Sequence, residues 1–193
     1  MKVGAVLLAA GGSKRLGTPK QLLCLDGETL IHRAARALTE SAAHSAVAVI
    51  GAHSATCRAE LRNLSVTVVH NPQWEQGIAS SLISGLDAIR QVLPNLDAVI
   101  FAVCDQPALT SKVINALIER FSSDQPDIVA SDYGSAKGVP ALFGQRLFND
   151  LSALHGDQGA KGLFTQYASS LVSIPFPGGD IDIDSPEDSR ALN

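Results

Sequence analysis

The chain of 193 residues has few aromatic side chains and no long apolar run. One Trp, two Tyr and six Phe are too few for a platform that stacks the bases of single-stranded nucleic acid. A net charge of −4 also argues against nucleic acid as a partner. No stretch approaches the ~18 apolar residues that a membrane span needs. We therefore expect a protein that binds neither nucleic acid nor a membrane.

Cysteines are scarce too, and their spacing excludes a zinc site of the usual kind. Cys24, Cys57 and Cys104 are odd in number and far apart, with no C-x-x-C pair. Reduced thiols in a cytoplasmic protein are the simple interpretation. The apolar run at the start of the chain is only about eight residues long and is broken by Gly11 and Gly12, unlike a signal peptide.

Several common catalytic patterns are missing as well. The sequence has no G-x-S-x-G elbow and no H-E-x-x-H helix. Its five histidines stand singly, which is more typical of surface or core positions than of ligands. A reaction that needs only positioning, charge neutralisation and a metal ion fits a chain without an evident covalent nucleophile.

The pattern that is present is an alternation of short apolar runs with amphipathic segments. Apolar residues make up 46% of the chain, enough for a globular core. Strands and helices that alternate in this way predict βαβ units, with a parallel sheet covered by helices on both faces. The predicted strands are 3–9, 46–50, 66–69, 98–103 and 128–130, and the predicted helices are 30–39, 54–63, 80–92 and 111–121.

Beyond residue 131 the rhythm changes. The segment 131–144 predicts a strand that turns back through Gly134 and Gly138, with Pro140 suited to an edge strand or a bulge. Two more helices, near 145–154 and 160–169, and a last strand at 172–174 complete the prediction. We therefore expect one α/β domain of three layers, α/β/α, around a mostly parallel, mixed sheet.

The most informative segment is the loop that follows the first predicted strand, in LLAAGGSKRLGTPKQ. Its spacing fits neither the P-loop nor the dinucleotide fingerprint. Glycine backbone can nevertheless approach an anion closely, and Lys14, Arg15 and Lys20 supply positive charge. A solvated basic loop is the alternative. We favour a phosphate site, because ligands of open α/β sheets bind at the carboxyl ends of the strands.

Carboxylates appear at two further places. Asp105 follows the predicted strand 98–103, where it can bind Mg²⁺, act as a base or cap the next helix. In DIDIDSPED, Asp180, Asp182 and Asp184 face one way on an extended chain, and a divalent cation would relieve their repulsion. Capping of a final helix by Asp184 or Ser185 is an equal alternative.

A pair of serines and the distribution of charge add two weaker signals. Ser80 and Ser81 either cap the helix predicted from 80 or contact a ligand base or sugar. Residues 1–62 carry eight Lys and Arg and four acids, and the rest of the chain carries seven and fifteen. A basic N-terminal part and an acidic remainder would fit a site where phosphates meet a carboxylate-bound metal ion. Chance is the alternative explanation, because surface charge is often unevenly distributed.

Taken together, these segments resemble a known family nearly end to end. LAAGGSKRLGTPKQLL resembles the nucleotide loop of nucleotidyltransferases with the nucleotide-diphosphosugar transferase (GT-A-like) fold. Within that superfamily of MobA-like NTP transferases, the molybdenum cofactor cytidylyltransferases are the subfamily that the chain resembles most. The segments that carry this likeness are WEQGIASSLISGL, CDQP, KGVPALF, GDQGAKGL and DIDSPED.

The resemblance implies a reaction in which the terminal phosphate of molybdopterin attacks the α-phosphorus of CTP. Pyrophosphate leaves, and molybdopterin cytosine dinucleotide forms. Arg15, Lys20 and Asp105 are implied to be catalytic, and Asp105 and Asp184 are implied to hold Mg²⁺ or Mn²⁺, with Asp182 as a neighbour. The residues implied to bind the nucleotide are Ala9, Ala10, Gly11, Gly12, Arg15, Lys20, Ser81 and Asp105.

The resemblance also divides the chain. Residues 1–107 would bind the nucleotide, and 108–193 would bind the acceptor and carry the C-terminal metal segment. KGVP and GDQGAKG would line the pterin side, with Val139 where the family often has His. Ala10 favours CTP, because guanylyl relatives read LAGG where this chain reads LAAG. A molybdenum hydroxylase would receive the product.

Two kinds of alternative remain open at this point. The nearest is a related transferase that uses GTP with molybdopterin, or CTP with a sugar or alcohol phosphate. The other is a non-catalytic protein that binds a nucleotide or a cofactor. The presence of both Asp105 and Asp184 argues against the second, because a dead enzyme is expected to lose a metal ligand.

Overall fold

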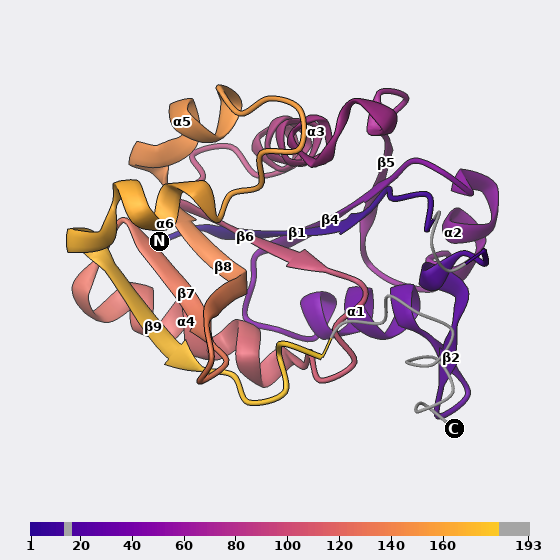
Figure 1. Cartoon of the computed structure of the whole chain (residues 1–193), viewed down its shortest axis with the longest axis horizontal. Coiled ribbons are helices and arrows are strands. Elements are labelled where there is room, and N and C mark those ends of the chain that lie inside the picture. Colours follow the sequence, from indigo (N-terminus) through magenta and orange to yellow (C-terminus); the bar gives the residue numbers. More distant parts are fainter. Residues whose placement is uncertain (14–16, 182–193) are drawn as a thin grey trace.

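A mixed sheet forms the middle layer of the molecule, and helices cover both of its faces (Figure 1). The computed structural model describes residues 1–13 and 17–181. In that part of the chain the sheet has seven strands, in the order β5-β4-β1-β6-β8-β7-β9. Helices α3, α5 and α6 lie on one face and α1 and α4 on the other (Figure 1). The predicted three-layer α/β/α fold is confirmed.

The first half of the chain builds the parallel part of the sheet. Its strands are β1 (Val3–Ala9), β4 (Ser45–Ile50), β5 (Thr67–His70) and β6 (Ala98–Val103). The helices that connect them are α1 (Leu30–Thr39), α2 (Ser54–Glu60) and α3 (Ile78–Val92). The connections also hold the 3-10 turns η1 (Lys20–Leu22) and η2 (Trp74–Gln76) and a small antiparallel ribbon of β2 (Cys24–Leu25) and β3 (Glu28–Thr29).

The second half adds the antiparallel part. Its elements are α4 (Ser111–Asp124), β7 (Ile128–Asp132), β8 (Lys137–Gly144), η3 (Gln145–Leu147), α5 (Phe148–Ser152), α6 (Gly162–Gln166), η4 (Ala168–Ser170) and β9 (Leu171–Pro175). Among the described strands of the seven-stranded sheet, β8 alone runs against the others, since it pairs antiparallel with both β6 and β7. This reversal brings the beginning of β8 to the edge of the sheet where the parallel strands end.

Local sequence signals account for the best-predicted elements. Strands β1 and β6 have the predicted bounds, and all seven residues of β1 are buried, as in a parallel strand covered on both faces. Helix α1 also has the predicted bounds, and the hydroxyl of Thr29 caps it by accepting a hydrogen bond from the backbone N–H of His32 at 3.4 Å.

In two places the structure decides between predicted alternatives. Helix α3 begins at Ile78, so neither Ser80 nor Ser81 is its cap; Gly77 takes that place with φ of 107°, a conformation that favours glycine. Strand β8 lies inside the sheet, so Pro140 is not on an edge strand. The alternative, a bulge, is confirmed, because the register of β7 with β8 shifts between Ala130 and Ser131.

Three of the predicted helices are shorter in the structure, whereas α4 continues three residues beyond its predicted end. The helix predicted at 54–63 ends at Glu60. The segments 145–154 and 160–169, each predicted as one helix, each correspond to a 3-10 turn and a five-residue α-helix. Each of these three helices is too short to be stable alone, so packing against the sheet holds it.

The core has two parts, one on each face of the sheet. Helix α3 packs very close to β1, because a Cβ on Gly85 would lie 2.5 Å from Cγ1 of Val6. This contact fixes the N-terminal turn of α3 beside the end of β1. The three cysteines are free, with Cys24 exposed and the other two buried. No described helix is long and apolar enough to cross a membrane.

Candidate active site

A cavity of about 370 Å³ lies at the carboxyl ends of β1 and β6. The glycine-containing loop, the turn η2 and the start of α3 supply its walls. The predicted nucleotide-binding residues that line it are Ala9, Ala10, Gly11, Gly12, Lys20, Ser81 and Asp105. The structure therefore brings together all of the described residues that were predicted to bind the nucleotide. Asp180 does not line this cavity, and its carboxylate accepts a hydrogen bond from the hydroxyl of Ser135 at 3.2 Å. Arg15, Asp182 and Asp184 lie outside the described residues.

Two opposite charges meet in this cavity. The ammonium of Lys20, on η1, forms an ion pair with the carboxylate of Asp105, which follows β6. Their side chains are 22% and 13% exposed, so solvent screens the pair only in part. Asp105 does not cap the next helix, because α4 begins at Ser111 with Thr110 in the cap position.

The glycine-containing loop packs against Trp74, the single Trp of the protein. A Cβ on Gly12 would lie 2.8 Å from Cη2 of Trp74, whereas among the described atoms nothing lies within 4 Å of a Cβ on Gly11. Gly12 is thus needed for the close approach of the indole ring. Trp74 was not among the residues predicted from the sequence, although it lies three residues before Gly77 in the segment WEQG.

Ser81 lies in the cavity wall and is held by a residue that sequence reasoning missed. The buried amide of Asn71 donates to the hydroxyls of Ser80 at 2.9 Å and Ser81 at 3.0 Å. The side-chain carbonyl oxygen of Asn71 accepts a hydrogen bond from the backbone N–H of Gln73 at 2.9 Å. Because Asn71 comes directly after β5, it orients the first turn of α3 from the neighbouring strand.

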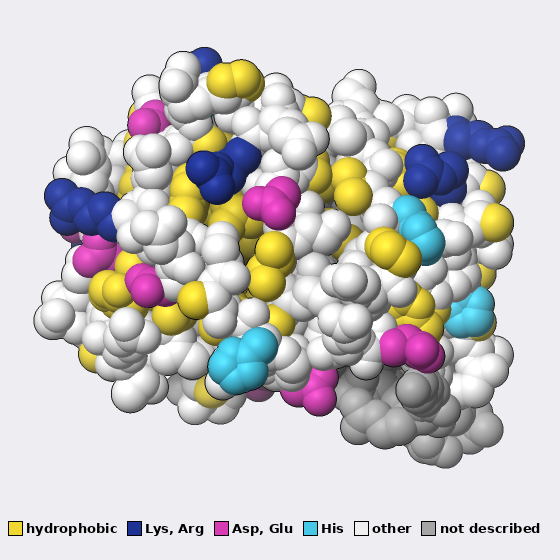
Figure 2. Space-filling model, turned by 90° about the horizontal axis from the view of Figure 1, so that it is seen from above, with side chains coloured by type: hydrophobic (Ala, Val, Ile, Leu, Met, Phe, Trp, Pro, Cys, Tyr) yellow, Lys and Arg dark blue, Asp and Glu magenta, His cyan; other side chains and the backbone are white. Residues whose placement is uncertain are grey.

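A second, larger pocket of about 540 Å³ adjoins this cavity. The two share Leu8, Ile78 and Val103 as lining residues. The second pocket is mostly apolar, and its wall includes Val139 and the segment 158–162. The segments KGVP and GDQGAKG, which lie far apart in sequence, are therefore neighbours. Figure 2 looks onto the face that α3 and α5 cover, where hydrophobic side chains show between scattered charges.

The loop 155–159 closes onto the start of α3 and joins the two pockets. The carbonyl of Gly156 accepts a hydrogen bond from the backbone N–H of Ala79 at 3.1 Å. A Cβ on Gly77 would lie 2.2 Å from that carbonyl oxygen, so only glycine fits there. Asp157 then faces the first cavity, while Gln158 and Lys161 line the second.

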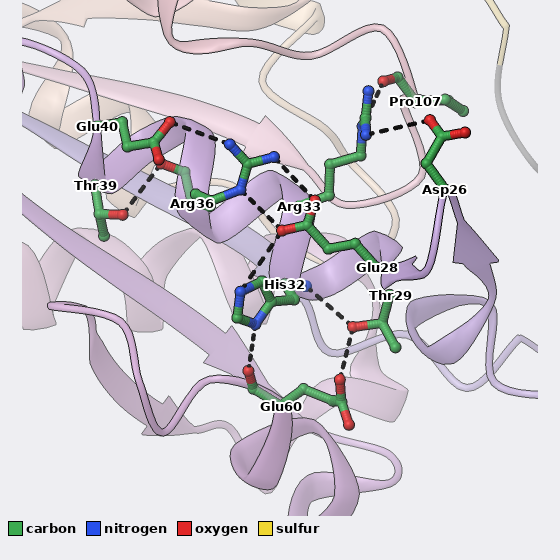
Figure 3. Close-up of polar contacts among 10 residues, drawn as sticks. All are labelled: Asp26, Glu28, Thr29, His32, Arg33, Arg36, Thr39, Glu40, Glu60 and Pro107. Carbon is green, nitrogen blue, oxygen red and sulfur yellow. Dashed lines mark hydrogen bonds and ion pairs between the residues drawn. The ribbon is translucent and has the colours of Figure 1, made fainter.

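A polar network around α1 supports the elements that carry Lys20 and Asp105 (Figure 3). Arg36 donates to both carboxylate oxygens of Glu28, at 2.8 and 2.9 Å. This hydrogen bonding from Arg36 lowers the pKa of Glu28. Arg33 donates from Nε to the carbonyl of Pro107 at 3.2 Å, which ties α1 to the loop after Asp105.

The carboxylate of Asp105, which pairs with Lys20, is one group in the cavity wall that suits a divalent metal. Glu75 and Asp157 also line the described part of this cavity. Residues 1–13 and 17–181 contain no group of three or more His, Cys, Asp or Glu that could hold a metal by themselves. Mg²⁺ is commonly held by one or two carboxylates together with substrate phosphates, so this donor set fits such an ion when a nucleotide is bound.

The fold and the cavity define the class: an α/β nucleotidyltransferase with its site at the carboxyl edge of the sheet. The chain belongs to the family of the MobA-like NTP transferase domain, whose model matches residues 5–171. The resemblance noted in the sequence is thereby confirmed at the level of this family.

Individual similar proteins match this chain over nearly its whole length. The chain is 27% identical over 198 residues to the purine catabolism protein PucB of Bacillus subtilis (strain 168), covering 95% of this chain and 92% of PucB. Rv0371c from Mycobacterium tuberculosis H37Rv superposes with a TM-score of 0.86 and 26% identity, covering 100% of this chain and 97% of its own. A manganese complex of Rv0371c is also similar, with a TM-score of 0.74, 23% identity and coverage of 100% and 98%.

Proposed function

We propose that this chain transfers CMP from CTP to the terminal phosphate of molybdopterin, which releases pyrophosphate and forms molybdopterin cytosine dinucleotide. The observation that carries the proposal is the pair of adjoining pockets. One has a glycine loop with Lys20 and Asp105, and the other is mostly apolar. A triphosphate suits the first and a flat heterocycle suits the second, and their shared wall lets the two substrates meet.

The proposal gives each nucleotide-side residue a role, which for Arg15 comes from the resemblance in sequence. Backbone N–H groups of the loop at Gly11 and Gly12 bind phosphate oxygens, and Lys20 offsets their charge together with Arg15. Ala9, Ala10 and Ser81 lie against the base and ribose. The methyl group of Ala10 narrows the space for the base and so favours cytosine over guanine.

Asp105 would hold Mg²⁺ or Mn²⁺, with Asp184 as the second ligand that the resemblance in sequence implies. Such an ion neutralises charge on the phosphates when it is bound. The manganese complex of Rv0371c supports the choice of a divalent cation. Asp105 also keeps Lys20 directed into the cavity, where the ammonium offsets negative charge that builds up on the triphosphate.

The chemical step is a displacement at phosphorus. A bond forms between an oxygen of the acceptor phosphate and the α-phosphorus of CTP, and the bond from that phosphorus to the oxygen that bridges it to the β-phosphate breaks. The electron pair of the broken bond leaves with pyrophosphate. No group of the protein is bonded covalently in this route, which agrees with a sequence that shows no evident nucleophile.

The division of the chain follows from the same assignment. Residues 1–107 form the nucleotide-binding half, and 108–193 form the acceptor-binding half and the C-terminal metal segment. CTP and molybdopterin are the small-molecule partners, and a molybdenum hydroxylase in the cytoplasm receives the product. Neither nucleic acid nor a membrane takes part.

The test is pyrophosphate release with Mg²⁺ and molybdenum-loaded molybdopterin, with CTP, GTP, ATP and UTP offered in parallel. Release with CTP alone is the expected result. Release with GTP would keep the chemistry and overturn the argument from Ala10. CTP turnover with a sugar or alcohol phosphate, and none with molybdopterin, would overturn the acceptor. If the chain binds CTP but releases no pyrophosphate with any acceptor, it is a nucleotide-binding protein and not a transferase.

A further inference from the structure

Gln21 is a buried polar residue to which neither the sequence motifs nor the proposed reaction assigns a role. It lies on η1, next to Lys20, and its side chain is 1% exposed. Its amide nitrogen donates to the carbonyl of Ala9 at 3.1 Å and to the carbonyl of Gly11 at 2.6 Å. Its amide oxygen accepts from the hydroxyl of Ser13 at 3.3 Å. Both N–H bonds of the amide are therefore used on the glycine loop.

Three successive backbone carbonyls of the loop accept hydrogen bonds from donors of the protein. Gln21 engages those of Ala9 and Gly11, and the backbone N–H of Ala52 donates to that of Ala10 at 3.0 Å. A carbonyl oxygen repels a phosphate oxygen, whereas a backbone N–H attracts it. A loop whose carbonyls are held by donors of the protein presents its N–H groups to the cavity.

The same amide also orders the end of the loop. Ser13 has φ of 49°, in the left-handed region, and its hydroxyl accepts from the backbone N–H of Lys20 at 2.9 Å while it donates to Gln21. The loop is thus tied to η1 through Ser13 and Gln21 together. Lys20 is fixed by the same turn that fixes the loop.

We propose that Gln21 is a positioning residue for the triphosphate: it holds the carbonyls of Ala9 and Gly11 away from the phosphates and so presents the loop N–H groups to them. The inference rests on the proposed function only in taking a nucleoside triphosphate as the ligand. It requires neither molybdopterin nor cytosine. Gln21 touches the loop and not the reacting atoms.

The test uses the full chain with Gln21→Met, which keeps the side-chain length and removes both donors without adding charge. Calorimetric titration compares its affinity for CTP, for inorganic triphosphate and for cytidine with those of the wild type. We expect the affinity for CTP and triphosphate to fall roughly 10- to 100-fold, since two buried carbonyls lose their donors. The affinity for cytidine should change less than threefold.

Two further variants guard against a purely structural effect. Gln91→Met, at an exposed position near the end of α3 and outside both pockets, is the matched control and should bind CTP as the wild type does. Gln21→Asn keeps the amide but cannot reach both carbonyls, so it should lose triphosphate affinity while it unfolds close to the wild-type temperature.

The outcomes separate this inference from the proposed function. Folded Gln21→Met and Gln21→Asn variants that bind triphosphate as tightly as the wild type would overturn the role of Gln21. An equal loss for cytidine and for triphosphate would also overturn it, because a general collapse of the site would then explain the result. A wild-type chain that binds CTP but never releases pyrophosphate overturns the proposed function alone. A wild type that binds no triphosphate overturns both.

Discussion

Lys20 and Asp105 form an ion pair although 85 residues separate them in the sequence. Lys20 comes from the turn η1 after the glycine loop, and Asp105 from the loop that follows β6. They meet because β1 and β6 are neighbours in the sheet and both end at the same edge. A cation suited to phosphates and an anion suited to a metal are thus held in one cavity.

The first prediction concerns the carboxylate of this pair. Asp105→Asn keeps the shape and removes the charge, so pyrophosphate release should fall at least roughly 100-fold through the loss of metal binding and of the partner of Lys20. The thermal unfolding temperature should stay near that of the wild type, because the residue faces the cavity. Asp87→Asn, at an exposed position of α3 outside the cavity wall, is the control. Full activity of Asp105→Asn would exclude a metal role.

The second prediction uses the contrast between two adjacent glycines. Gly12→Ala places a methyl group against the indole of Trp74, so it should cost about 1 kcal/mol and lower the unfolding temperature by about 2–4 °C. Gly11→Ala should leave the unfolding temperature unchanged, since its Cβ meets no described atom within 4 Å.

The readout of this contrast is intrinsic fluorescence, to which Trp74 contributes as the only Trp of the protein. Its emission should shift in Gly12→Ala and not in Gly11→Ala. CTP should also change the emission of the wild type, because Trp74 lines the cavity. Identical spectra of the two variants would contradict the contact between loop and ring.

The third prediction is a dependence of stability on pH at the Glu28–Arg36 pair. Hydrogen bonding from Arg36 lowers the pKa of Glu28 in the folded state. The pair therefore stabilises the fold above the unfolded pKa of Glu, about 4.3, and this contribution is lost as pH falls through the lower, folded value. Glu28→Gln should cost about 1 kcal/mol at pH 7, and its difference from the wild type should shrink as pH falls below about 4.3.

Urea unfolding at pH 7, 5, 4 and 3 measures this difference. Glu40→Gln is the matched control, because Glu40 contacts the same Arg36 at 3.2 Å but its side chain is more than half exposed. Its effect at pH 7 should be smaller than that of Glu28→Gln. A difference for Glu28→Gln that stays constant from pH 7 to pH 3 would contradict the assignment.

Elements with a strong local pattern were predictable, and elements set by their neighbours were less so. The apolar runs of β1 and β6 and the Thr29 cap of α1 gave the observed bounds. The start of α3 was misplaced, because it depends on Gly77, whose conformation is imposed by the carbonyl of Gly156 from a loop almost 80 residues later. A serine is a good cap in isolation, but this contact outweighs that preference.

By itself, the sequence determined the α/β class, the loop that follows the first strand, and the aspartate at the end of β6, because each has a signature within about ten residues. Only the tertiary structure decided the order of the strands and the place of β8 between β6 and β7, which puts Val139 in the wall of the second pocket. It also decided that Trp74 supports Gly12 and that Gln21 holds the loop carbonyls. Contacts of this kind join segments that approach each other only when the sheet forms, so no periodicity or motif encodes them locally.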